Sequence, residues 1–171
     1  VARRAQVAAP TVYRHFPTRK ELLEALHAHV NQMMPPPPPT GDWKVDVRAL
    51  YRWRGETQDA IGPFTASSFV WDLRRQITVP ARRARVEEMI EREVPGVGGA
   101  LRTTLVDLLI VTVSDSMVAA FRGYLGLDPD VAADRAIWAI EGAFEQARRE
   151  VAAARRRGEA AEAPSRAART K

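Results

Sequence analysis

Apolar residues recur at helical spacing along the sequence, and proline, glycine and aspartate separate the apolar segments. Strand-like alternation of apolar and polar residues is absent from it. The pattern therefore predicts an all-α fold. The helices that we expect run from Pro10 to Phe16, from Thr18 to about Met34, from Trp43 to about Gly55, from Pro63 past Leu73, from Ala81 to Glu93, from about Gly99 to Tyr124, and from Pro129 towards Arg157, with Gly158 as the stop.

The second predicted helix begins with a capping box. Residues 18–21 fit the pattern Ser/Thr-x-x-Glu/Gln, in which the Thr18 hydroxyl accepts from the Glu21 N–H and the Glu21 carboxylate accepts from the Thr18 N–H. An apolar stripe follows on one face of this helix. It consists of Leu22, Leu23, Leu26, Val30 and Met33.

Five consecutive prolines, Pro35–Pro39, stop that helix and form a stiff spacer of roughly 3 Å per residue. Such a spacer can also be a proline-rich ligand, but a domain boundary is the interpretation we favour. The sequence thus predicts a small head over residues 1–34, a proline-rich linker over 35–41 and a helical body over 42–158. Residues 159–171 contain Pro164 and no apolar stripe, which predicts a disordered basic tail.

The basic charge is concentrated at the two ends of the chain. Of the formal net charge of +5, residues 1–34 contribute +3, from five basic and two acidic side chains. A basic head on a nearly neutral body favours contact with a polyanion, although such an excess is also common on solvated surfaces. The basic tail from Arg155 to Lys171 is a second candidate for nucleic-acid affinity.

The sequence lacks the residues that several classes of function require. Without cysteine, the chain has no disulfide, no thiol nucleophile and no cysteine metal site. His27 and His29 are two residues apart and point to different sides of a helix, so we expect no metal site, no cofactor and no enzyme activity. The most apolar run, residues 105–113, is shorter than a membrane span, and no signal peptide is visible. We therefore expect a cytoplasmic protein without membrane contact.

Residues 1–23 read as the second half of a helix-turn-helix, a motif whose recognition helix lies in the major groove of DNA. Val12 and Phe16 are four apart and share the face that would pin this helix, while the opposite face carries polar side chains. Threonine, proline and alanine suit base edges, and tyrosine, histidine and arginine suit phosphates. The candidates for DNA contact are Ala9, Pro10, Thr11, Tyr13, Arg14, His15, Arg19 and Lys20.

The segment from Ala5 to Leu23 resembles the TetR family of transcriptional regulators, in its Thr-Val-Tyr-x-His-Phe core and the Pro-Thr-Arg-x-x-Leu-Leu that follows. The resemblance covers about the first 30 residues, and the later helices are similar to the family's ligand-binding and dimerisation domain in pattern only. It implies a helical homodimer that binds double-stranded operator DNA and is released by a small-molecule inducer. By position, Ala9, Pro10 and Thr11 would approach bases. Tyr13, His15 and Arg19 would hold phosphates, with Lys20 nearby.

The segment departs from the family pattern in three ways. Gln6 stands where a turn glycine is usual, so a left-handed backbone there costs about 1 kcal/mol or more. Ala8 replaces the usual Ser or Thr cap, which forfeits roughly 1 kcal/mol. The first helix of the motif would lie before Val1, and we expect either a fragment or a mis-called start site. The alternative function is a dimeric small-molecule-binding or structural protein whose head no longer binds DNA.

The body offers candidates for a ligand cavity between helices, although most aromatic residues of such a body belong to its core. Ser114–Ser116 interrupt an apolar helix, and we expect them to contact an inducer, water or a partner subunit. The family resemblance implies that the last two long helices pair with their copies, where Ala136, Ala139, Ala143 and Ala147 would permit close approach. The candidate ligand residues are Trp53, Phe64, Trp71, Asp115 and Phe121.

Overall fold

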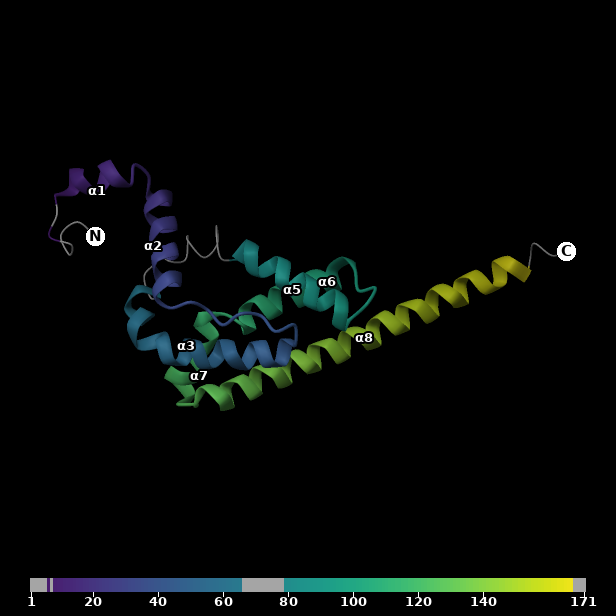
Figure 1. Cartoon of the computed structure of the whole chain (residues 1–171). Coiled ribbons are helices and arrows are strands. Elements are labelled where there is room, and N and C mark those ends of the chain that lie inside the picture. Colours follow the sequence, from purple (N-terminus) through teal and green to yellow (C-terminus); the bar gives the residue numbers. More distant parts are fainter. Residues whose placement is uncertain (1–5, 7, 66–78, 168–171) are drawn as a thin grey trace.

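The computed structural model describes residues 6, 8–65 and 79–167, and within these ranges all regular structure is helical (Figure 1). The all-α prediction is therefore confirmed. The helices are α1 (Ala9–His15), α2 (Arg19–Met33), α3 (Trp43–Thr65), α5 (Val79–Glu93), α6 (Gly99–Thr112), α7 (Asp115–Leu125) and α8 (Pro129–Ala167).

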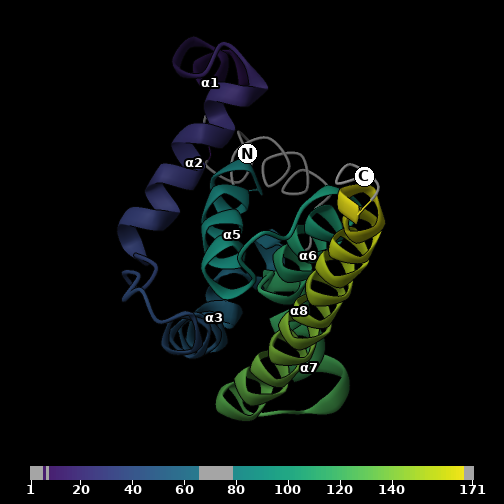
Figure 2. The same ribbon diagram turned by 90° about the vertical axis from the view of Figure 1, so that its right-hand side faces the viewer.

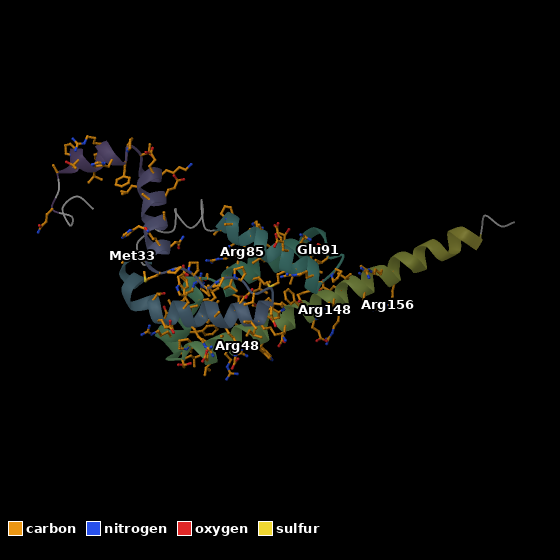
Figure 3. All side chains as sticks on the ribbon, viewed as in Figure 1. Met33, Arg48, Arg85, Glu91, Arg148 and Arg156 are labelled. Atoms are coloured by element: carbon orange, nitrogen blue, oxygen red, sulfur yellow. The ribbon has the colours of Figure 1, made fainter. Side chains whose placement is uncertain are left out.

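Between α2 and α3 the chain is not helical, as the prolines predict. Met33 ends α2 (Figure 3), and the segment after it leads back along α3 to the first turn of that helix (Figure 1). The start of α3 is held by two aspartates. The Lys44 N–H donates to Asp42 Oδ1 over 2.8 Å, and the Thr40 N–H and hydroxyl both donate to Asp46 Oδ1 over 2.7 Å.

Helices α3, α5, α6, α7 and α8 together form the core of the body. Of these, α3 and α8 run antiparallel, and α6 and α7 pack on α8 (Figures 1 and 2). The Trp43 ring meets the Phe144 ring edge to face, with centroids 5.6 Å apart. Tyr51, Ile90, Leu109 and Ile140 are also fully or almost fully buried. The predicted core face of α5, formed by Val86, Met89 and Ile90, is confirmed as buried.

Helix α3 continues past Gly55 to Thr65, so the predicted end near Gly55 is wrong, and so is a new helix opening at Pro63. Gly55 does not end the helix; it allows close packing against α8. A Cβ at Gly55 would overlap the Pro129 ring at the start of α8, so glycine allows the two helices to approach closely. The residues from Ser67 through Leu73, including Phe69 and Val70, lie outside the described part of the chain.

The long helix predicted from Gly99 to Tyr124 is in fact two helices, α6 and α7, bent by 55° at their break. The Ser114 hydroxyl accepts from the Met117 N–H over 3.2 Å and caps α7. Ser114 therefore begins a helix where the apolar pattern alone predicts continuity. Among the described residues no single helix is both long and apolar enough to span a membrane. The bent pair of α6 and α7 meets both conditions only when its two helices are taken together.

Helix α8 runs past Gly158 to Ala167, so the predicted stop at Gly158 is wrong, and residues 159–167 of the expected disordered tail are helical. Its C-terminal half extends well beyond the other helices, and Arg156 lies on this extension (Figures 1 and 3). Of the alanines expected to face a partner subunit, Ala136 and Ala147 are buried in the chain's own core and Ala143 packs against it. Ala139 alone among the four is exposed.

Candidate nucleic-acid interface

Helix α1 lies at one end of the molecule, across the end of α2 and away from the body (Figure 1). None of its seven residues is buried. Val12 and the following Phe16 are half-buried, whereas Tyr13, Arg14 and His15 are exposed, Tyr13 by 69%. The helix thus turns an aromatic and two basic side chains outward, opposite the apolar pair, as the spacing predicts.

The N-terminal tip of α1 carries the residues predicted to approach bases. Ala9 and Pro10 are exposed in the first turn, and Thr11 is half-buried beside them. Proline is favourable there because its missing N–H would have no helical partner. The Thr11 N–H donates to the Ala8 carbonyl over 3.0 Å, which closes the first turn. The tip therefore presents small side chains and a threonine together.

The turn before α1 shows both weaknesses predicted for it. Gln6 has φ +54°, so a residue with a side chain occupies the left-handed region that favours glycine. Ala8 is extended and offers no side-chain hydrogen bond to α1. Gln6 and Ala8 therefore lack the conformational freedom of glycine and the capping side chain that would favour this turn.

Helix α2 begins with the predicted cap in a modified form. The Glu21 N–H donates to the Thr18 hydroxyl over 3.2 Å, and that hydroxyl donates to Glu21 Oε1 over 2.8 Å instead of the carboxylate receiving the Thr18 N–H. Lys20 is exposed and lies 3.7 Å from Glu24, a weak surface pair. Arg19 is the first residue of α2, and its side chain lies outside the described part. The start of α2 thus adds a lysine and a helix N-terminus to the basic surface of the head.

Of the residues predicted to bind a ligand, the structure brings Asp115 and Phe121 together on one helix but not Trp53. Asp115 and Phe121 belong to α7, which packs on α3, and the Phe121 ring lies 6.3 Å from the Tyr51 ring. Trp53 is half-buried, and its spacing places it on another side of α3 from Tyr51. Trp71 and the side chain of Phe64 lie outside the described residues.

Tyr51 and Arg54, which the sequence pattern does not single out, hold the break between α6 and α7. The Tyr51 hydroxyl donates to the Thr112 carbonyl over 2.6 Å, and the Arg54 guanidinium donates to the Val113 carbonyl. Arg54 Nε also pairs with Asp115 Oδ1 at 2.5 Å. These α3 groups therefore satisfy backbone carbonyls that a helix end leaves without partners.

The polar cluster at this break is buried. Arg54 is 4% exposed and Tyr51 is not exposed. Burial raises the pKa of Tyr51 to about 12, against a smaller lowering by the Arg54 charge. One signal in the sequence points to the cluster: Arg54 continues the spacing of Trp43, Val47 and Leu50, and a cation on an apolar face needs a buried partner.

In the comparison with known proteins, the match lies in the head. Residues 1–26 match the model of a family described as bacterial regulatory proteins, tetR family. The matched stretch contains all of α1 and the first half of α2, and hence every predicted DNA-contacting residue. No curated protein matches the chain. No solved structure matches it either.

Proposed function

We propose that the chain is a TetR-type DNA-binding regulator, a repressor that a small molecule releases from operator DNA, because its amino-terminal segment matches the model of that family. The observation that carries the proposal is the outward face of α1. Within the family-matched segment, that face exposes Tyr13, Arg14 and His15 next to a tip formed by Ala9 and Pro10.

In this proposal, α1 enters the major groove with its tip first. The methyl groups of Ala9 and Thr11 and the Pro10 ring suit a thymine methyl, and the Thr11 hydroxyl suits a polar base edge. Tyr13, Arg14 and His15 would contact phosphate oxygens on one strand. Arg19 and Lys20, at the start of α2, would hold further phosphates by charge and by the helix dipole. Phosphate contacts fix the position of the helix, and the tip reads the sequence.

The body would carry the response to a ligand through α3. This helix follows the linker to the head and also binds the α6–α7 break through Tyr51 and Arg54. A ligand near Asp115 and Phe121 that takes Arg54 or Asp115 as its polar partner would alter how α3 packs on α7. We propose Trp53, Phe64 and Trp71 as further ligand contacts.

We propose a homodimer that uses the outward faces of α6 and α8. Leu108 and Val111 of α6 are 47% and 55% exposed, and Ala139 on the neighbouring α8 is exposed as well. Exposed apolar residues on adjacent helices are typical of a subunit interface. Changing Leu108 to lysine should shift the sedimentation coefficient from dimer to monomer. An unchanged value would contradict this interface.

A gel-shift titration with the DNA upstream of the protein's own gene tests DNA binding. Tyr13→Phe and Arg19→Ala should weaken binding to operator and random DNA alike, and Arg19→Ala should lower the salt slope by about one unit. Thr11→Ala should lose about 1–3 kcal/mol on one base pair only. Arg85→Ala, which removes an equal charge from α5 (Figure 3), serves as the control and should bind as the wild type does.

Equal losses for Thr11→Ala on operator and random DNA would contradict its base-reading role. The strained Gln6 and uncapped Ala8 favour a second candidate function, a dimeric small-molecule-binding or structural protein whose head does not bind DNA. Repeating the titration with any in-frame upstream codons included separates the two. Failure of the longer chain to shift operator DNA would favour the second candidate.

A further inference from the structure

A surface groove of about 520 Å³ lies where the first turn of α3, the end of α5 and the middle of α8 meet. Its volume falls within the roughly 300–1,000 Å³ that small-molecule sites occupy. The groove is separate from the α6–α7 break and from the head, since none of its lining residues belongs to α1, α2, α6 or α7.

Aromatic side chains form its apolar surface. Trp43 is held rigidly by its edge-to-face contact with buried Phe144, while Trp138 is 76% exposed at the rim. Most aromatic residues of the body are expected to belong to its core, and Trp138 is an exception. Gly142 lies one turn after Trp138, and a Cβ there would meet nothing within 4 Å. An open space therefore borders the exposed indole.

The charges of the groove favour a cation. Three carboxylates, Glu93, Glu141 and Glu145, face two cationic side chains, Lys44 and Arg148. Glu93 pairs with Arg148 at 3.0 Å (Arg148 is labelled in Figure 3). Glu145 pairs with Arg149 at 2.6 Å, one turn further along α8, and both side chains are mostly exposed. Glu145 can therefore exchange its partner for a ligand at little cost.

The groove already binds an ammonium group of its own. Lys44 Nζ lies 5.6 Å from the centre of the Trp43 ring and pairs with Glu141. An indole face and a carboxylate thus hold one cation between them. Trp138 and Glu145 repeat this combination of an indole and a carboxylate, seven residues apart on the same face of α8.

We propose that this groove binds an organic cation with a flat aromatic body. The body stacks on Trp138 over Gly142, and the positive charge faces Glu145 and Glu141. This site goes beyond the proposed DNA-binding and ligand-release function. It requires that the proposed homodimer leave Trp138 uncovered, although its neighbour Ala139 belongs to the proposed interface.

Titration calorimetry at pH 8 with N-methylacridinium tests the proposal, with uncharged acridine as a probe of nearly the same shape. We expect a Kd of about 0.1 mM for the cation, a size-limited affinity for a ligand of this kind. Acridine should bind at least about fivefold more weakly, because it lacks the charge. Equal affinity for the two probes would overturn the proposal.

Variants on α8 locate the site. Trp138→Leu and Glu145→Gln should each weaken binding about two- to fivefold, and the double variant more than tenfold. Glu88→Gln removes an equal charge from the exposed face of α5 and should leave the Kd unchanged. Both substituted α8 side chains are exposed, so circular dichroism should show an unchanged fold. Wild-type affinity in the double variant would overturn the assignment.

A second copy of the chain is the rival occupant of the groove. If it covers Trp138, quenching of that tryptophan by acrylamide should fall as the protein concentration rises, and the cation should bind only the dilute protein. Cation binding that is independent of protein concentration supports the proposal. Binding that disappears on association overturns it.

Discussion

Tyr13 in the head and Tyr51 in the body lie in opposite environments. In the head, Tyr13 projects from a seven-residue helix with no buried residue and no side-chain cap. In the body, Tyr51 and Phe144 are fully buried and join helices that are far apart in the sequence. Because burial of apolar surface is the main stabilising term, the body holds its own fold. The head instead exposes its side chains to solvent, where a binding partner can reach them.

The largest expected difference between the two regions follows truncation of an aromatic side chain. Phe144→Ala should lower the free energy of unfolding by about 3–5 kcal/mol, because it leaves a cavity beside Trp43. Tyr13→Ala should change it by less than about 0.5 kcal/mol. Urea unfolding followed by circular dichroism measures both. Similar losses at the two sites would contradict the comparison.

The buried Tyr51 should make the body sensitive to alkali. Its pKa in the folded state is raised to about 12, above the usual value of 10, so the folded state holds this proton more tightly. The resulting stabilisation is present below pH 10 and is lost between pH 10 and 12, by up to about 3 kcal/mol. Tyr51→Phe should remove that decline, and it should cost about 1 kcal/mol at neutral pH because the hydrogen bond to Thr112 is lost.

Tyr124→Phe is the matched control, since Tyr124 is 90% exposed. This variant should keep the alkaline decline of the wild type. Urea midpoints from pH 8 to 12 provide the measurement. A Tyr51→Phe profile as steep as that of the wild type would show that another group causes the decline.

The third prediction compares a buried ion pair with an exposed one. Arg54→Met should destabilise the body by about 2–3 kcal/mol, since Asp115 and the Val113 carbonyl lose the guanidinium between α3 and α7. Arg48→Met, which breaks an exposed 2.5 Å pair with Asp134, should cost less than about 1 kcal/mol. The test is thermal unfolding of both variants, of Asp115→Asn alone, and of Arg54→Met combined with Asp115→Asn. If the combined loss equals the sum of the single losses, the two residues are not coupled.

The smallest change is expected in the head and should stay there. Gln6→Gly removes the strain of a positive φ at a residue with a side chain, and Ala8→Ser supplies a cap for α1. Each change should stabilise the folded head by about 1 kcal/mol. Amide hydrogen exchange should slow in α1 and stay unchanged in α3 and α8. Slower exchange throughout the chain would mean that the head and the body unfold as one unit.

Local features predicted much of this fold. The capping threonine at Thr18, the proline run and the apolar faces of α3 and α5 follow from spacing and backbone chemistry alone. The outward face of α1 was predictable for the same reason. The errors at Gly55 and Ser114 arose because their roles depend on distant partners: Gly55 is required by Pro129, and the break at Ser114 is held by Tyr51 and Arg54.

The antiparallel packing of α3 on α8 has a further consequence, for the uniqueness of the fold. Three exposed ion pairs, Lys44–Glu141, Arg48–Asp134 and Arg52–Asp130, run along this contact, and each adds little free energy. Their alignment distinguishes one register from its neighbours. Sliding α8 by one turn, about 5.4 Å, would misalign the charges and bring Pro129 against a residue that has a side chain. Gly55 and the ion pairs together therefore favour a single register of α8 on α3.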